Sequence, residues 1–375
     1  MKNKRLVLSA ALTFALALPQ PARSESGPQF RDLKSQAMGR SGVASAGGPL
    51  SLFFNPAALA DFKGGTLGVS TDLGLNSVLL DYATWAADNY KYLNNMDSLL
   101  ARIGPVDNKW APFSQTFAIY GQYEGIAFAA VEDLRYNLTI GKAVVTPVPG
   151  VGALSDLTLM AGRGFQAPEG YRFGVGLKYV YRIRFDDRLV GTTDDEFYKV
   201  KNAWDKPDKG FFDKLAKLQV ADEIADTRMG LGVNLGAEKD VSDNWTAGVS
   251  LLDFPTIMAA EFVRPDINLG VAYHRPVEFV QDLDQRLLVN VDYQHFLLPG
   301  TPWFKQLKMG IALEGAMKGR PAALIAMGIN DGYPTFGIRV GYIGYLSYVY
   351  VAQEVGTYPG QEKLSFHKIS FDLAY

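Results

Sequence analysis

A two-residue alternation of apolar with small or polar side chains constrains the fold of this chain more than any other feature. The clearest example runs from Tyr171 to Ile183, where the odd positions are apolar or aromatic. The even positions between them carry Arg172, Lys178, Arg182 and two glycines. Successive side chains of a β-strand point to opposite faces, so this segment is predicted to be a strand with one apolar face. A soluble sheet and a membrane barrel both accommodate one such strand.

Recurrence of the pattern favours the barrel. It returns at 229–236, 245–251, 267–274, 307–314 and 336–342. Segments of about ten residues with one apolar and one small or polar face are the signature of transmembrane barrel strands. Many of the 38 glycines fall on the second face, which indicates a crowded interior. No stretch after residue 24 offers the ~18 apolar residues of a membrane helix.

Counting from Thr66, we predict fourteen strands, at 66–85, 113–121, 126–140, 153–165, 171–184, 227–238, 245–252, 265–274, 286–296, 306–314, 322–330, 335–343, 345–354 and 364–375. The first segment can be read as two short strands broken at Gly74. We treat it as one long, bent strand because single-chain bacterial barrels have even strand numbers. The predicted fold class is an all-β, 14-stranded antiparallel transmembrane β-barrel.

Both ends of the chain carry export signals. Basic residues at 2–5, an apolar run from Leu6 to Leu18 and the small-residue stretch Ala22-Arg23-Ser24 predict a secretory signal peptide over 1–24. The alternative is an uncleaved anchor helix, for which the run is short. At the other end, four apolar residues alternate with polar or small ones and resemble the β-signal read by the barrel-assembly machinery: Ile369, Phe371, Leu373 and Tyr375. We therefore expect outer-membrane localisation, with that machinery, outer-membrane lipid and lipopolysaccharide as partners.

Residues 25–65 do not alternate. They contain the glycine-bearing stretch 38–44 and the sequence Leu52-Phe53-Phe54-Asn55-Pro56-Ala57-Ala58-Leu59-Ala60. Pro56 is placed to open a short helix. We expect 25–65 to form a hatch in the lumen and 66–375 to form the barrel. The alternative for 25–65 is a periplasmic linker against the barrel mouth.

The two stretches together, MGRSGVA and LFFNPAALA, resemble the hatch region of the FadL (long-chain fatty acid transporter) superfamily. That superfamily includes PorV-type barrels, which assist protein secretion, and TraF-like barrels associated with conjugal transfer. The resemblance implies a hatch containing Asn55, Pro56 and Ala57. In fatty-acid transporters it also implies a hydrophobic path that ends at a lateral opening in the wall. The present chain is shorter than typical transporters of that kind.

Outer loops supply the candidate ligand or partner contacts. The longest connection, 185–226, carries apolar residues among many charges and predicts an amphipathic helix near 209–220. Its candidate contacts are Phe197, Trp204, Phe211, Phe212 and Leu215. Beside the loop 86–112 it forms either an apolar groove or a self-packed cap on the barrel rim. The connection 141–152 is expected to be another outer loop.

Chemistry-bearing motifs are missing from the sequence. The three histidines lie on separate predicted strands without metal-ligand spacing, no GxSxG elbow occurs, and there is no cysteine. We therefore expect no catalytic residue, no metal and no cofactor, and a net charge of −2 gives no argument for nucleic acid. The acidic run 194–196 is either a divalent-ion site or a solvated loop. Five cations expected in the lumen either pair with carboxylates or line a path for anions: Arg172, Lys178, Arg182, Arg184 and Arg339.

The leading functional hypothesis is a hatch-bearing barrel that transports hydrophobic, fatty-acid-like small molecules across the outer membrane. Capture at the apolar outer loops would be followed by hatch displacement near Asn55-Pro56-Ala57 and by lateral or periplasmic release. The alternative is a non-transporting barrel that serves as a scaffold or accessory in protein secretion or conjugal transfer. A lumen sealed by polar contacts would favour that alternative.

Overall fold

A computed structural model of the chain describes residues 32–45, 47–92, 98, 101–102, 104–105, 109–143, 146–189, 226–258, 261–263, 265–281, 283–296, 301–317, 320–355, 360–361 and 363–374. The predicted signal peptide lies outside these residues, as do Tyr375, the acidic run 194–196, the predicted helix near 209–220 and the five candidate outer-loop contacts.

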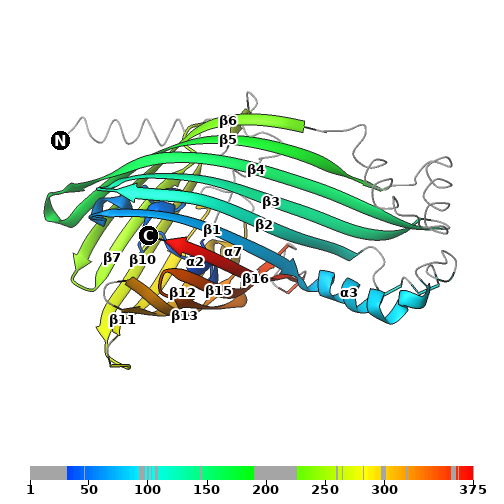
Figure 1. Cartoon of the computed structure of the whole chain (residues 1–375). Coiled ribbons are helices and arrows are strands. Elements are labelled where there is room, and N and C mark those ends of the chain that lie inside the picture. The colour runs from blue at the N-terminus through cyan, green and yellow to red at the C-terminus, as the bar shows by residue number, and fades with distance from the viewer. Residues whose placement is uncertain are drawn as a thin grey trace.

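The wall is a closed antiparallel barrel (Figure 1). Its strands are β1 (Gly65–Asn76), β2 (Lys109–Tyr123), β3 (Ile126–Ala143), β4 (Thr146–Ala167), β5 (Tyr171–Leu189), β6 (Asp226–Ser242), β7 (Trp245–Leu252), β10 (Asp266–Val277), β11 (Asp284–Tyr293), β12 (Leu307–Met317), β13 (Arg320–Asn330), β14 (Tyr333–Gly341), β15 (Gly344–Glu354) and β16 (Lys363–Ala374). Each pairs with its neighbour in the chain, β1 pairs with β16, and β5–β6 completes the ring. The predicted 14-stranded barrel is confirmed.

Two short strands were not anticipated. β8 (Thr256–Met258) and β9 (Glu261–Val263) pair with each other, and β8 also pairs with β6. They continue the β7–β10 hairpin beyond an irregular step at Asp253, whose backbone φ is +58°. Much of the predicted loop 253–264 is therefore an extension of the wall.

The prediction for the first strand was wrong beyond Asn76. β1 ends there, and α3 (Ser77–Asn89) follows. The Asn76 side chain caps this helix by accepting a hydrogen bond from the Val78 N–H. Tyr82 then packs against Ala111 of β2, and its hydroxyl donates to the Lys109 carbonyl. The capping residue and this apolar face stabilise a helix where alternation suggested a strand.

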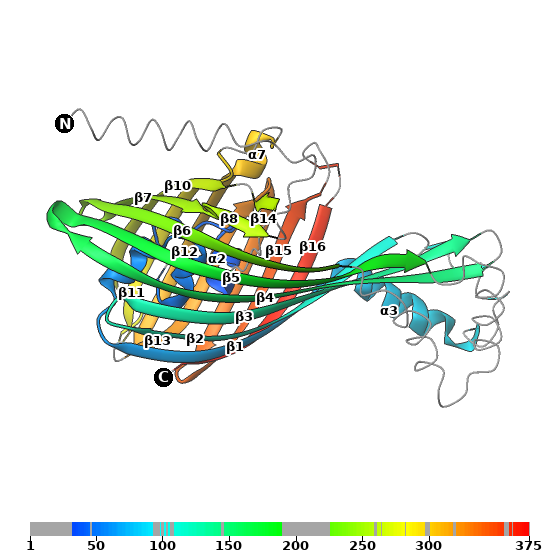
Figure 2. The same cartoon turned by 90° about the horizontal axis from the view of Figure 1, so that it is seen from above.

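The outer ends of β2 to β5 extend farther than predicted. The expected loop 141–152 is wrong, because β3 and β4 stay paired from Ile126–Arg163 out to Ala143–Thr146. Figure 2 shows these four strands continuing past the outer ends of β14 to β16, with α3 beside them. Together they form an arm at the end of the barrel opposite the short hairpin turns.

The two faces of the wall have the chemistry that the alternation predicts. Large apolar side chains exposed on the outer face include Leu67, Phe117, Phe128, Leu177, Leu231, Ile325, Ile369, Phe371 and Leu373. Such a surface requires contact with lipid rather than water. Within the described residues, no helix has the length and apolar character needed to cross a bilayer.

The N-terminal segment lies inside the barrel. It consists of α2 (Leu33–Ala37), the 3-10 helices η1 (Pro49–Phe53) and η2 (Pro56–Asp61), and the turns between them. Both figures show it enclosed by the strands, as expected for a hatch rather than a linker at the mouth. Smaller elements are η3 (Tyr90–Tyr92), η4 (Pro168–Gly170) and α7 (Trp303–Gln306).

Candidate functional site

The hatch lies in a belt of lumen-facing glycines. A Cβ on Gly174 of β5 would lie 2.1 Å from the Pro56 carbonyl carbon, and one on Gly310 of β12 would lie 2.4 Å from the Met38 carbonyl oxygen. Other wall glycines that face hatch atoms this closely are Gly162, Gly164, Gly236, Gly248, Gly270, Gly328 and Gly337. The glycines noticed in the sequence therefore leave room for a second layer of chain. Contact at this distance is possible only without a side chain.

Along this belt the hatch passes the strands in the reverse of their chain order. Ala37 lies at β14, Met38 at β12 and β13, Val43 at β10 and β7, and Pro56 at β5. It thus runs as an arc from β14 to β4.

The first part of the hatch, residues 32–45, is held by polar side chains of the wall. Asp292 of β11 accepts hydrogen bonds from the N–H groups of Gly42 (2.6 Å) and Val43 (3.0 Å) through one carboxylate oxygen. Thr335 of β14 accepts from the Gly39 N–H and donates to the Ala37 carbonyl. These bonds satisfy backbone groups that a turn inside a barrel would otherwise bury without partners.

The last part, residues 51–62, is held by apolar packing. Its buried side chains Leu52, Phe53, Phe54 and Leu59 contact the small or apolar inner faces of β2, β3 and β4. Polar contacts add to this packing: Asn234 of β6 donates to the Leu52 carbonyl at 3.0 Å. Asn55 is fully buried; its Nδ2 donates to the Val43 carbonyl, and its Oδ1 caps η2 through the Ala57 N–H. Asn55 therefore joins the two parts of the hatch, and Pro56 and Ala57 seat η2 on the wall.

Three of the five lumen cations singled out in the sequence pair with carboxylates. Lys178 pairs with Asp253, and Arg182 pairs with Asp156 through Nε–Oδ1 at 2.6 Å. Arg172 contacts Asp61 of the hatch and Asp240 of β6. For these three, the pairing alternative is confirmed rather than an open path for anions. Arg339 instead donates weakly to Ser347 and faces a cavity.

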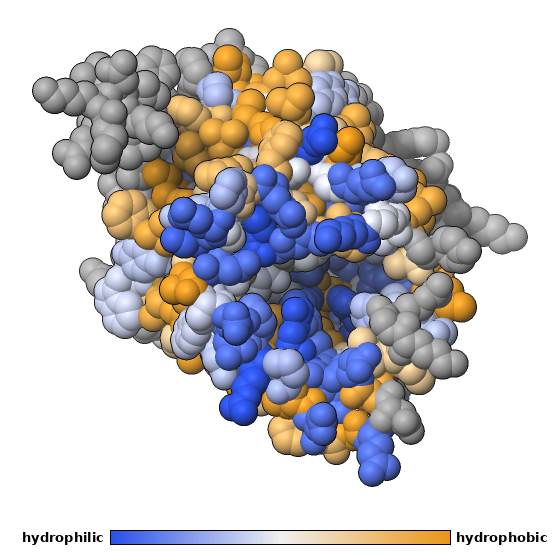
Figure 3. Space-filling model, turned by 90° about the vertical axis from the view of Figure 1, so that its left-hand side faces the viewer, coloured by the Kyte–Doolittle hydropathy of each residue, from blue (hydrophilic) through white to orange (hydrophobic). Residues whose placement is uncertain are grey.

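This cavity, of about 920 Å³, lies between the hatch and the barrel end that has the short hairpin turns, which we take as the periplasmic end. It is bounded by the hatch segment 41–51, by the periplasmic ends of β10 to β13, and by the inner faces of β14 to β16, β1 and β2. Figure 3, which looks at that end of the barrel, shows hydrophilic residues around a hollow and hydrophobic residues farther out. Apolar surface inside the cavity comes from residues such as Leu33, Leu50, Phe54 and Leu324.

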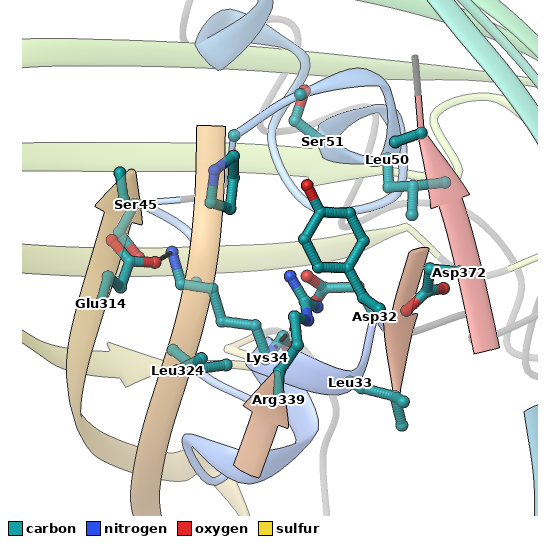
Figure 4. A pocket seen from close by; sticks show the side chains of 18 of the residues that line it. Asp32, Leu33, Lys34, Ser45, Leu50, Ser51, Glu314, Leu324, Arg339 and Asp372 are labelled. Carbon is teal, nitrogen blue, oxygen red and sulfur yellow. Dashed lines mark hydrogen bonds and ion pairs between the residues drawn. The ribbon is translucent and has the colours of Figure 1, made fainter. Parts of the chain in front are cut away.

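Charged groups stand opposite one another in the cavity (Figure 4). Lys34 of α2 pairs with Glu314 of β12 at 2.7 Å, and Arg286 reaches the other oxygen of Glu314 at 2.6 Å. The Asp32 carboxyl caps α2 through the Ser35 N–H, and the Arg339 guanidinium lies beside it in the figure. Removal from water raises the pKa of Asp32, and the positive charges of Lys34 and Arg339 only partly offset this.

The pairing ladder between β14 and β15 ends early. Their pairing stops at Phe336–Tyr350, while β15 continues to Glu354. The gap is bridged by the Asn330 side chain, which donates to the Ala352 carbonyl at 2.8 Å. Because this contact spans the unpaired stretch, strand pairing in the described wall gives no sign of the lateral opening that the family resemblance implies.

Among the described residues, no cluster of three or more histidine, aspartate or glutamate side chains is arranged to hold a metal ion. Sequence reasoning identified the hatch motif and the lumen cations but missed Asp292, Thr335 and Glu314. Their only signal was position: each is a polar residue on the inward phase of an alternating strand. Of the predicted β-signal, Ile369, Phe371 and Leu373 point to the lipid side.

The comparisons with solved structures agree with this architecture. TodX, a monoaromatic hydrocarbon channel, matches in its deltaS2S3 mutant with a TM-score of 0.51 and 13% identity, over 92% of this chain and 98% of that chain. Its deltaS2 mutant matches with a TM-score of 0.50 and 13% identity, over 92% and 97%. The chain has the fold of the TodX channels. The toluene transporter TbuX of Ralstonia pickettii also matches, with a TM-score of 0.47 and 11% identity over 92% and 98%.

No protein-family model and no curated protein sequence matches the chain. The barrel fold that the sequence resemblance implied is the fold that the chain has. That fold, together with the lipid-facing apolar surface, is that of an outer-membrane barrel.

Proposed function

We propose that this barrel is a channel for small hydrophobic molecules, with the hatch as its gate. The observation that carries the proposal is a non-covalently held segment inside the lumen, next to a cavity of about 920 Å³ with apolar patches. That volume falls within the ~300–1,000 Å³ of typical ligand sites. The TodX-like fold supports the same class of ligand, since the TodX mutants are described as hydrocarbon channels.

The gate is best assigned to the middle of the hatch rather than to Asn55-Pro56-Ala57. Asn55 is buried and anchored on two sides, whereas residues such as Ser45, Gly48 and Leu50 line the cavity. A Cβ placed on Gly47 or Gly48 would have no neighbour within 4 Å, so this segment has room to move. Its withdrawal would connect the lumen above the hatch with the cavity and the periplasm.

A reversible disulfide between the hatch and the wall tests whether the hatch segment acts as a gate. The chain has no cysteine, and the side chains of Ser45 and Asn290 already hydrogen-bond each other. Cells that lack their own transporter would express S45C/N290C, with S45C alone as the control. We expect oxidation to abolish uptake of a long-chain fatty acid or toluene by the double variant only, and reductant to restore it. Equal uptake in both redox states, with the disulfide shown to form, would refute gating by this segment.

A scaffold or accessory role in secretion or conjugation is the second candidate, favoured by the ion pairs that line the inner wall above the cavity. It predicts no uptake of either compound by the correctly folded wild type.

We also propose that residues 1–24 are cleaved during export and that Ile369, Phe371 and Leu373 serve in assembly. The apolar residues of 185–226, including Phe197 and Trp204, are proposed outer contacts. N-terminal sequencing of the membrane form should give Glu25 first.

A further inference from the structure

Three cations on the lipid side of the wall lie close to its periplasmic rim. Arg163 of β4, Lys239 of β6 and Arg275 of β10 occupy the outward phase of their strands, within about four residues of each strand's periplasmic end. Arg163 and Arg275 are exposed, and Lys239 is half-buried. All three lie on one side of the barrel, which we call the basic flank.

Aromatic rings stand between these cations. Arg163 lies 5.2 Å from the Phe165 ring centre, and Lys239 lies 4.4 Å from that of Tyr171, to whose hydroxyl it also donates a hydrogen bond. Trp245 and Tyr273 pack together at 5.0 Å on the adjacent strands β7 and β10. Amphipathic rings favour the depth of lipid headgroups. The aromatic residues therefore indicate that the three charges lie at the periplasmic boundary between the outer membrane and water.

The cations of the basic flank lack protein counter-charges. In the described part of the chain, none of the three has a carboxylate within ion-pair distance; Glu169 acts on Lys239 only from farther away. The lumen cations Arg172, Lys178 and Arg182 behave in the opposite way, since each forms an ion pair. A charge left unpaired at a lipid-facing site has an anion available from the bilayer itself.

The other side of the rim differs. Outward residues near the periplasmic ends of β1, β2, β3, β14 and β16 are apolar or aromatic and exposed: Leu67, Tyr123, Ile126, Val340 and Leu373. On these five strands, the described outward residues next to the rim therefore carry no positive charge comparable to the basic flank.

We propose that the basic flank binds the phosphate groups of anionic phospholipids in the periplasmic leaflet. Each cation would take one headgroup phosphate while the neighbouring ring contacts the glycerol and upper acyl region. Such sites would hold anionic phospholipid on one side of the barrel. This inference depends on the outer-membrane location and is independent of whether the barrel transports anything.

Native mass spectrometry of the detergent-purified barrel tests the proposal with phosphatidylglycerol and phosphatidylcholine of identical acyl chains. The wild type should retain phosphatidylglycerol preferentially. The variant R163Q/K239Q/R275Q should lose that preference, with affinity lowered about fivefold at each site, the effect expected for a basic residue near an anionic surface. The matched control is K363Q, which removes an exposed lysine at the outer end, where Lys363 lies 5.5 Å from the Tyr350 ring centre.

Unchanged phosphatidylglycerol retention in the triple variant would overturn the proposal, and so would an equal loss in K363Q. A second measurement uses only the wild type. Raising the salt concentration should weaken phosphatidylglycerol retention and leave phosphatidylcholine unaffected, because screening acts on exposed charges. Salt-independent retention would contradict phosphate binding even if the triple variant did not fold.

Discussion

The first and last parts of the hatch are fixed to the same wall by different proportions of polar and apolar contact, and glycine clearance serves both. Residues 32–45 combine buried apolar side chains with several directional bonds, chiefly those from Asp292, Thr335 and the Lys34–Glu314 pair. Residues 51–62 depend mainly on large buried apolar side chains, with fewer wall bonds such as that from Asn234 to the Leu52 carbonyl. A hydrogen bond or ion pair is lost when either partner is removed. Apolar packing is weakened by substitutions that change the volume of a side chain in the contact.

This difference indicates which part of the hatch can leave the wall first. The segment between the two parts faces the cavity, so release of the polar part would swing it aside while the apolar part stays seated. Single-cysteine reporters are well suited to follow this, because the chain has no native cysteine. Maleimide labelling of V43C reports the first part and that of A58C reports the last, since both positions are buried when docked.

The largest effect is expected from adding volume under the last part. Gly174→Val would place a Cβ 2.1 Å from the Pro56 carbonyl carbon, so the hatch backbone must move. We expect a loss of about 3 kcal/mol of docking energy, near the upper end for overpacking. That corresponds to roughly 100-fold faster labelling of A58C.

The matched control is Gly315→Val, because a Cβ on Gly315 has its nearest neighbours at 3.8 Å or more. Equal labelling rates in the two backgrounds would show that the glycine belt does not determine how the hatch is seated.

Removal of the central acceptor of the first part should be the next largest effect. Asp292→Ala leaves the buried N–H groups of Gly42 and Val43 without their partner. A lost hydrogen bond to a charged group costs about 2 kcal/mol, so V43C should label roughly 30-fold faster while A58C is unchanged. Asp284→Ala is the control, since Asp284 lines the cavity but is exposed. Faster labelling at both reporters would mean that the hatch moves as one body.

These two residues also show how far the sequence reaches. Alternation located Gly174 on the inward phase of its strand, because that phase depends only on local spacing, whereas Asp292 was not singled out. It could not say that each meets the hatch, since Asp292 contacts a residue 250 positions earlier in the chain. The same local reasoning failed at Ser77, where a cap from Asn76 and packing on β2 stabilise a helix in an alternating stretch. Contacts between distant segments depend on ring closure and strand stagger, which no short window of sequence contains.

A smaller effect is expected from the ion pair at the start of the hatch. The side chains of Lys34 and Glu314 are 19% and 23% exposed, so solvent screens part of their attraction. Lys34→Gln should weaken docking by up to about 1 kcal/mol, or roughly fivefold in V43C labelling. Arg286→Gln is the control, because it removes the other, more exposed partner of Glu314 and leaves the hatch contact intact. A double-mutant cycle of Lys34→Gln and Glu314→Gln that gives no coupling would remove this pair from the list of anchors.

The smallest expected effect is a dependence of docking on pH, and it again separates the two parts. The pKa of Asp32 is raised in the docked hatch by desolvation, against the opposing charges of Lys34 and Arg339. A docked carboxyl with a raised pKa contributes full stability below its ordinary pKa near 3.8 and loses it as the pH rises through the raised value. V43C should therefore become more accessible as the pH rises through that window, relative to A58C at the same pH. Asp32→Asn keeps an oxygen to cap α2 through the Ser35 N–H but carries no charge, so it should abolish this dependence and hold the first part closed at neutral pH. If the Asp32→Asn barrel kept the wild-type pH profile, the titrating group would lie elsewhere, and Asp32 would not control docking of the first part.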